Sequence, residues 1–271
     1  MEFINDLAKP DIIELRGIEK SYGLGDKKKT IIEGFNFLIE RNENIVNGKR
    51  QGQFKTILGP SGCGKSTVLR MIAGLTKPTS GSVLIDEVPI TESPKIGMVF
   101  QKYSNFPWLT VLENVALGLK FQGINKKERQ ERAMEMVKLV GLEGHEDKFA
   151  QYPTLSGGQL QRVAIARSLV ASPNILLMDE PFGALDVKTR LQMQDLLVTI
   201  YETLNPTIIF VTHDIQEAVY LSDDIYIMGT APSKFVMHYD IALPFNRKGI
   251  KRDPKFMKIV EQIEDTMMSI N

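Results

Sequence analysis

The sequence predicts an α/β fold with a parallel sheet and crossover helices, a small antiparallel sheet beside it, and an inserted α-helical lobe. Three observations predict this arrangement. Short β-rich runs recur, and each is followed by a turn and a helical pattern, which is the order of elements in a parallel sheet. Two segments nearer the N-terminus alternate apolar and polar residues, as antiparallel strands do. Between residues 101 and 172 the pattern becomes helical.

The strands of the parallel sheet are expected at five short, largely apolar runs, whose continuity indicates burial on both faces. These runs cover residues 54–58, 96–100, 174–178, 207–211 and 224–228. The strands of the antiparallel sheet are expected at residues 12–16 and 34–40. The polar segment 41–53 is expected to be a loop.

The helical lobe is expected to contain three helices. The first covers residues 110–121. The second, residues 125–140, opens with Asn125 and has Glu128 three residues later, a start that is similar to a capping box. The third begins after Ser156, which is the expected N-cap.

The predicted organisation is one domain followed by a C-terminal tail. The tail is charged after Pro244 and is expected to be helical and peripheral. The domain covers residues 1–245, with a core at about 11–100 and 173–240 and the lobe at about 101–172, and the tail covers residues 246–271.

The composition excludes several classes of protein. The formal net charge is zero, so no general electrostatic attraction to nucleic acid is expected. One cysteine, Cys63, rules out a disulfide within the chain. The first ten residues show no secretory signal, and no apolar run reaches the roughly 18 residues that span a bilayer. A membrane role would therefore require a partner protein.

A glycine-rich loop follows the first buried strand and opens a helix, which is the context of a P-loop. Its glycines let backbone N–H groups surround phosphate oxygens, Lys65 adds a positive charge, and the Ser66 hydroxyl can ligate Mg²⁺. The alternative is a strand–helix turn without a ligand. The predicted nucleoside-triphosphate site consists of Gly59, Pro60, Ser61, Gly62, Cys63, Gly64, Lys65, Ser66 and Thr67. Within it, Cys63 is expected to be reactive and to report on bound phosphate, because Lys65 and the helix N-terminus favour the thiolate.

Two acids end a later buried strand. In P-loop enzymes the first, here Asp179, holds Mg²⁺ directly or through water. The second, Glu180, is the candidate general base for an attacking water. A solvated pair of acids is the alternative, and the P-loop makes it the weaker interpretation.

The segment LSGGQ gives the class of P-loop protein. Through Leu155, Ser156, Gly157, Gly158 and Gln159 the chain resembles the ATP-binding cassette (ABC) family. The resemblance extends from about residue 12 to about 239 and implies a RecA-like P-loop core. It also implies ATP hydrolysis with Mg²⁺ in a homodimer, in which each subunit's signature closes over its partner's P-loop.

Further residues match the family's positions. Tyr22 resembles the aromatic residue that stacks on adenine, and a surface tyrosine is the alternative. Gln101 resembles the Q-loop glutamine that contacts Mg²⁺ or the attacking water. Asp186 resembles the D-loop aspartate and can also N-cap the next helix. His213 resembles the switch histidine at the γ-phosphate, and a polar surface residue is the alternative.

The segments 179–186 and 106–115 resemble importer ATPases of the nitrate, sulfonate and taurine group. The resemblance implies a permease, a separate solute-binding protein and a place on the cytoplasmic face of the membrane. Trp108 is then either a permease contact or a buried residue of the lobe. The chain departs from its relatives by about ten extra residues within 41–53 and by the single Thr154 between Pro153 and the signature.

Two other functions compete with this hypothesis. A soluble ABC ATPase acting on DNA or ribosomes would be expected to carry a coiled-coil arm or paired cassettes, and neither is visible. A P-loop kinase would not explain the signature segment. The transported solute cannot be deduced from this chain, because the permease and the solute-binding protein select it.

Overall fold

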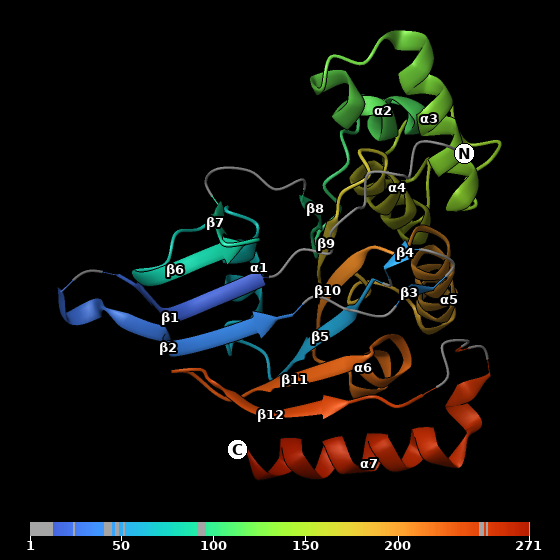
Figure 1. The fold of residues 1–271 in the computed structure, drawn as a ribbon. Helices are drawn as coiled ribbons and strands as arrows, with labels where there is room; N and C mark the ends of the chain where they lie inside the picture. The colour runs from blue at the N-terminus through green and yellow to red at the C-terminus, as the bar shows by residue number, and fades with distance from the viewer. Residues whose placement is uncertain are drawn as a thin grey trace. The chain divides into compact units, whose positions relative to one another are not determined.

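The computed structural model describes residues 13–23, 25–40, 45–46, 49–50, 52–90, 96–243, 247 and 249–270. The chain forms two compact units (Figure 1). The first unit consists of Met1–Pro94 and Asn205–Asn271, and the second of Lys95–Leu204. The predicted lobe, residues 101–172, belongs to the second unit.

The first unit contains the predicted antiparallel sheet. Its strands are β1 (Ile13–Tyr22), β2 (Lys29–Ile39), β6 (Ser80–Ile85) and β7 (Val88–Pro89), in the order β2-β1-β6-β7. A short 3₁₀ turn, Gly25–Lys27, precedes β2. Strand β1 extends beyond the predicted residues 12–16. Gly17, directly after the predicted strand, has a φ of 56°, and the register of the pairing with β2 shifts around it. This irregularity interrupts the alternation that would have revealed the whole strand.

The first unit also contains three parallel strands centred on β5 (Phe54–Leu58). Strands β10 (Thr207–Thr212) and β11 (Asp224–Met228) pair with it on either side. An additional antiparallel strand that was not predicted, β12 (Phe235–Asp240), pairs with β11. The helices α1 (Lys65–Ile72) and α6 (Ile215–Leu221) follow β5 and β10, as the predicted strand–helix order requires.

The segment predicted to be a loop contains a small hairpin. Strands β3 (Ile45–Val46) and β4 (Lys49–Arg50) pair antiparallel. The rest of the segment up to residue 51 lies outside the described residues. The expectation of a loop is therefore wrong for β3 and β4, where two residue pairs were too short to show alternation.

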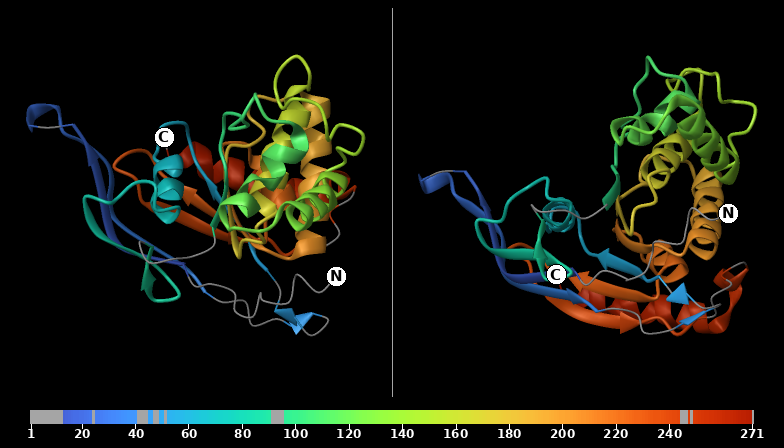
Figure 2. Two further views of the ribbon diagram at one scale, coloured as in Figure 1. Left: turned by 90° about the horizontal axis from the view of Figure 1, so that it is seen from above. Right: turned by 45° about the horizontal axis from the view of Figure 1, so that its top comes forward.

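The second unit contains two parallel strands and four helices. Strand β8 (Ile96–Val99) pairs with β9 (Ile175–Asp179). The helices of the predicted lobe are present and cluster together (Figure 2). The second and third begin after Asn125 and Ser156, the polar residues predicted to open them, and the structure adds Thr110 as the N-cap of the first. The three helices are α2 (Val111–Phe121), α3 (Lys126–Leu139) and α4 (Gly157–Leu169), and α5 (Val187–Leu204) completes the unit.

The tail contains a 3₁₀ turn, Ile250–Arg252, and the helix α7 (Pro254–Ser269), which runs beside β12 (Figure 1). The tail is helical and packs through one face. The side chains of Phe256, Val260 and Ile263 lie at helical spacing and are buried. The tail is thus part of the packed body of the first unit.

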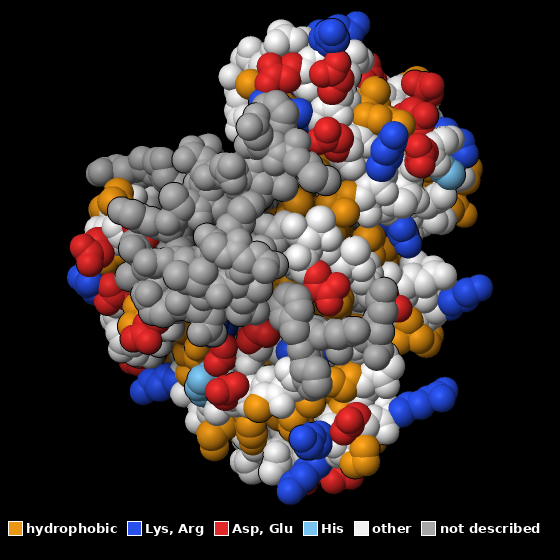
Figure 3. All heavy atoms as spheres, turned by 45° about the vertical axis from the view of Figure 1, so that its right-hand side comes forward, with side chains coloured by type: hydrophobic (Ala, Val, Ile, Leu, Met, Phe, Trp, Pro, Cys, Tyr) orange, Lys and Arg blue, Asp and Glu red, His pale blue; other side chains and the backbone are white. Residues whose placement is uncertain are grey.

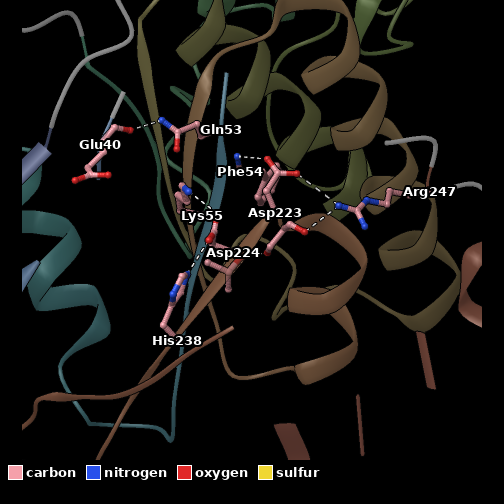
Figure 4. A network of polar contacts seen from close by, with 10 residues as sticks. Glu40, Gln53, Phe54, Lys55, Asp223, Asp224, His238 and Arg247 are labelled. Atoms are coloured by element: carbon pink, nitrogen blue, oxygen red, sulfur yellow. Dashed lines mark hydrogen bonds and ion pairs between the residues drawn. The ribbon is translucent and has the colours of Figure 1, made fainter. Parts of the chain in front are cut away.

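A polar network joins the tail to the strands of the first unit (Figure 4). The Asp224 carboxylate accepts hydrogen bonds from Lys55 and, at 2.7 Å, from His238. Asp223 accepts from the backbone of Phe54 and lies 3.5 Å from the Arg247 guanidinium. These contacts satisfy charged groups that would otherwise be costly to bury.

None of the helices in the described ranges combines the length and the hydropathy needed to cross a bilayer.

Candidate nucleotide site

The phosphate loop of the first unit requires its glycines. A Cβ on Gly59 would lie 2.7 Å from the carbonyl oxygen of Met228, so no larger residue fits there. Gly62 and Gly64 have φ values of 80° and 105°, a conformation that favours glycine. Gly64 is also the N-cap of α1. The loop therefore turns its backbone sharply between β5 and the helix.

Lys65 extends back over this loop. Its ammonium group donates hydrogen bonds to the carbonyl oxygens of Gly59 at 2.9 Å and Pro60 at 3.0 Å. Ser61 and Gly62 are exposed, whereas Ser66 and Thr67 are half-buried in the first turn of α1. A positive charge and a helix N-terminus thus meet at an open loop, which is the requirement for binding phosphate.

Cys63 does not have the predicted environment. Its side chain is buried, and its sulfur would lie 3.0 Å from a Cβ placed on Gly59. Its carbonyl oxygen accepts a hydrogen bond from the Ser233 hydroxyl. The expectation of an accessible, reactive thiol is therefore wrong, because position in the loop does not determine which way the side chain points.

The acidic pair and the Q-loop glutamine belong to the second unit. Asp179 ends β9 and is buried, and Glu180 follows it with a φ of 43°. The Gln101 side-chain amide donates a hydrogen bond of 3.2 Å to the Glu180 carboxylate. Because β8 and β9 are parallel, their carboxyl ends meet at one edge and bring these two residues together. A left-handed conformation at a non-glycine residue is strained and is frequent at functional sites.

The signature segment forms a capped helix start. Leu155 is fully buried and anchors it. The hydroxyl of Ser156 accepts from the backbone of Gln159, and the Gln159 side chain accepts from the backbone of Ser156. The first turn of α4 contains no acidic residue. This helix start is therefore electrostatically suited to an anion.

The remaining predicted residues are accessible. Tyr22 is exposed at the end of β1, with the Lys20 ammonium 5.0 Å from its ring centre. His213 is exposed after β10. Asp186 caps α5 by accepting a hydrogen bond of 3.0 Å from the Thr189 backbone, which confirms the predicted capping role. Hydrogen bonds from Thr189 hold the pKa of Asp186 below its ordinary value.

The predicted site residues are divided between the two units. Tyr22, the phosphate loop and His213 belong to the first, and the others belong to the second.

Trp108 is exposed, and its ring centre lies 5.3 Å from that of Phe106, so the alternative of a buried tryptophan is wrong. Sequence analysis missed Tyr103, whose hydroxyl oxygen would lie 2.6 Å from a Cβ on Gly157. The only feature of the sequence that could have drawn attention to Tyr103 is its place two residues after Gln101.

A phosphate loop, an acidic strand end and a Ser-Gly-Gly helix start define a nucleotide-hydrolysing cassette. The sequence model of the family described as "ABC transporter" matches residues 44–183. The chain belongs to this family and is an ATP-hydrolysing subunit with its mixed α/β fold.

Two relatives and one solved structure show how far the similarity extends. The nitrate import ATP-binding protein NrtD of Synechocystis sp. is 43% identical over 83% of this chain and 87% of its own length. The aliphatic sulfonates import ATP-binding protein SsuB of Bacillus cereus is 41% identical over 93% of this chain and 94% of its own. A dimeric ATP-binding cassette in a post-hydrolysis state, bound to ADP and Pi, matches 86% of this chain and 100% of its own, with a TM-score of 0.71 and 35% identity.

Proposed function

We propose that this cassette powers a bacterial-type importer of small solutes such as nitrate, sulfonates or taurine, bound through a permease to the cytoplasmic face of the membrane. The names of NrtD and SsuB support the importer branch. A separate solute-binding protein would deliver the cargo.

The observation that carries the catalytic part of the proposal is the hydrogen bond between Gln101 and Glu180. Glu180 accepts a proton from the attacking water, and Gln101 holds the carboxylate in place. His213 contacts the γ-phosphate. Tyr22 stacks on adenine, and the phosphate loop with Lys65 binds the phosphates.

The residues present fit a magnesium ion that arrives with the nucleotide. The described residues include no cluster of three acidic, histidine or cysteine side chains that could hold a metal alone. Mg²⁺ is usually held by one or two carboxylates together with waters and substrate phosphates. Ser66, Gln101 and Asp179 supply such a limited set of oxygen ligands. The ion would neutralise phosphate charge during hydrolysis.

The working form is a homodimer with two composite ATP sites. The capped start of α4, with Ser156, Gly157 and Gly158, faces the nucleotide of the partner subunit, and Leu155 and Gln159 support it. Asp186 belongs to the D-loop. The dimeric state of the similar solved cassette supports this arrangement. ATP binds the closed dimer more tightly than the open one, so binding and hydrolysis switch the permease between its two states. The exposed Trp108 is a candidate contact to that permease.

A soluble ATPase acting on DNA or ribosomes is the second candidate, and charge disfavours it. On the face seen in Figure 3, acidic and basic side chains of the coloured residues are interspersed. Nucleic-acid binding requires a clustered basic surface.

The proposal is tested by reconstituting the chain in proteoliposomes with the permease and the solute-binding protein encoded beside it. ATPase activity should rise when the binding protein carries nitrate, a sulfonate or taurine, and the stimulating solute identifies the cargo. Activity that responds to none of these solutes but rises with DNA or ribosomes would contradict the importer assignment.

A further inference from the structure

The two signature glycines are covered by different side chains of their own unit. A Cβ on Gly157 would lie 2.6 Å from the Tyr103 hydroxyl oxygen, and a Cβ on Gly158 would lie 2.4 Å from a methyl carbon of Thr189. Real Cβ atoms do not come this close to other heavy atoms. Neither position could accept even alanine without displacing a neighbour.

Tyr103 belongs to a segment that is bonded along the length of α4. The Asn105 amide donates a hydrogen bond of 2.7 Å to the carbonyl oxygen of Leu160. Near the other end of the helix, Arg167 donates to the Ser104 carbonyl at 2.7 Å. Residues 104 and 105 are therefore held against α4 near both of its ends.

The same segment begins next to the catalytic carboxylate, because Gln101 is bonded to Glu180. Two residues later, Tyr103 contacts Gly157. No described residue forms a hydrogen bond with its hydroxyl, so packing alone carries this contact. Burial raises the pKa of Tyr103, which keeps the phenol neutral.

We propose that Tyr103 is a positioning residue for the signature motif, which sets the start of α4 by packing against Gly157. This inference rests on the proposed composite site.

The test is a double-mutant cycle on the Glu180→Gln chain, in which the ATP concentration for half-maximal dimer formation is measured. Gly157→Ala should raise this concentration because the new methyl group meets the tyrosine hydroxyl. Tyr103→Phe removes the hydroxyl oxygen. The nearest remaining atom of the side chain would be the ring carbon Cζ, which lies 3.5 Å from a Cβ at position 157, an ordinary van der Waals contact. The effect of Gly157→Ala should then shrink by roughly threefold or more, the coupling expected of residues in contact.

Gly158→Ala is the matched control, because its methyl group meets Thr189 and should not be rescued by Tyr103→Phe. If Gly157→Ala fails to fold, the single variant Tyr103→Ala tests the positioning role by itself. It should raise the ATP concentration needed for dimerisation and leave ATP affinity in dilute monomer unchanged. Equal rescue of both glycine variants, or unchanged dimerisation in Tyr103→Ala, would overturn the positioning role. Failure of Glu180→Gln itself to dimerise would instead overturn the composite site.

Discussion

The side-chain amide of Gln101 donates a hydrogen bond of 3.2 Å to the carboxylate of Glu180. This contact joins the ends of two parallel strands, and it places an orienting group on the candidate general base. The neighbouring Asp179 is buried at the end of the same strand.

Gln101→Ala should lower kcat about tenfold to a hundredfold, because a carboxylate that is no longer held misplaces the attacking water. The affinity for ATP should change by less than about threefold, since the proton acceptor and the phosphate loop remain. Steady-state ATPase assays separate the two parameters. Lys102→Ala, at the exposed neighbouring position, is the control. A raised KM with unchanged kcat would argue against the orienting role.

Cys63 should react slowly with a maleimide in the folded chain and rapidly in denaturant, because its side chain is buried beneath the loop. Mass spectrometry of the intact chain measures the labelled fraction over time. As the chain's sole cysteine, it needs no mapping. Rapid labelling of the native chain that MgATP prevents would show that the thiol faces the phosphates.

The tail helix should contribute to stability through its buried face. Phe256→Ala should lower the free energy of unfolding by about 3–5 kcal/mol, the usual cost of removing a buried aromatic side chain. Met257→Ala, at the exposed next position, should change it by less than about 0.5 kcal/mol. Urea denaturation measures both. Equal effects of the two changes would mean that α7 is not packed in solution.

Tyr226 should make stability fall in alkaline solution. Burial, with the nearby charges of Asp224 and Glu40, raises its pKa to about 12. The unfolded chain loses this proton near pH 10 and the native chain retains it, so the free energy of unfolding falls from about pH 10 to about pH 12. Tyr226→Phe should flatten this fall, and Tyr152→Phe at an exposed position should not. Thermal unfolding at pH 9 and pH 11 tests this, and parallel curves for all three chains would contradict it.

Local signals predicted much of the fold. The apolar run Phe54–Leu58 is β5 without change, and Ser156 caps α4 as predicted, because its hydroxyl accepts from the backbone of Gln159. The prediction failed where a signal was irregular or not local. Gly17 hid the continuation of β1, and the apolar run of β12 is only Phe235–Met237 before His238 interrupts it.

The candidate site shows the same division. Motif spacing identified its residue types, and family resemblance supplied their roles. Neither motif spacing nor family resemblance could predict which way a side chain points, because this depends on tertiary packing. Cys63 is buried, and Trp108 is exposed. The contact of Tyr103 with Gly157 joins residues far apart in the sequence, and no spacing rule predicts it.

Glu180 is the proposed general base of an ATP site that a second subunit completes. In Glu180→Gln the amide cannot accept the water's proton, so turnover should fall at least about a hundredfold while ATP still binds. Light scattering with size-exclusion chromatography should then show a stable dimer with MgATP and a monomer without nucleotide. A chain that stays monomeric with MgATP and retains wild-type turnover would contradict both the base and the composite site.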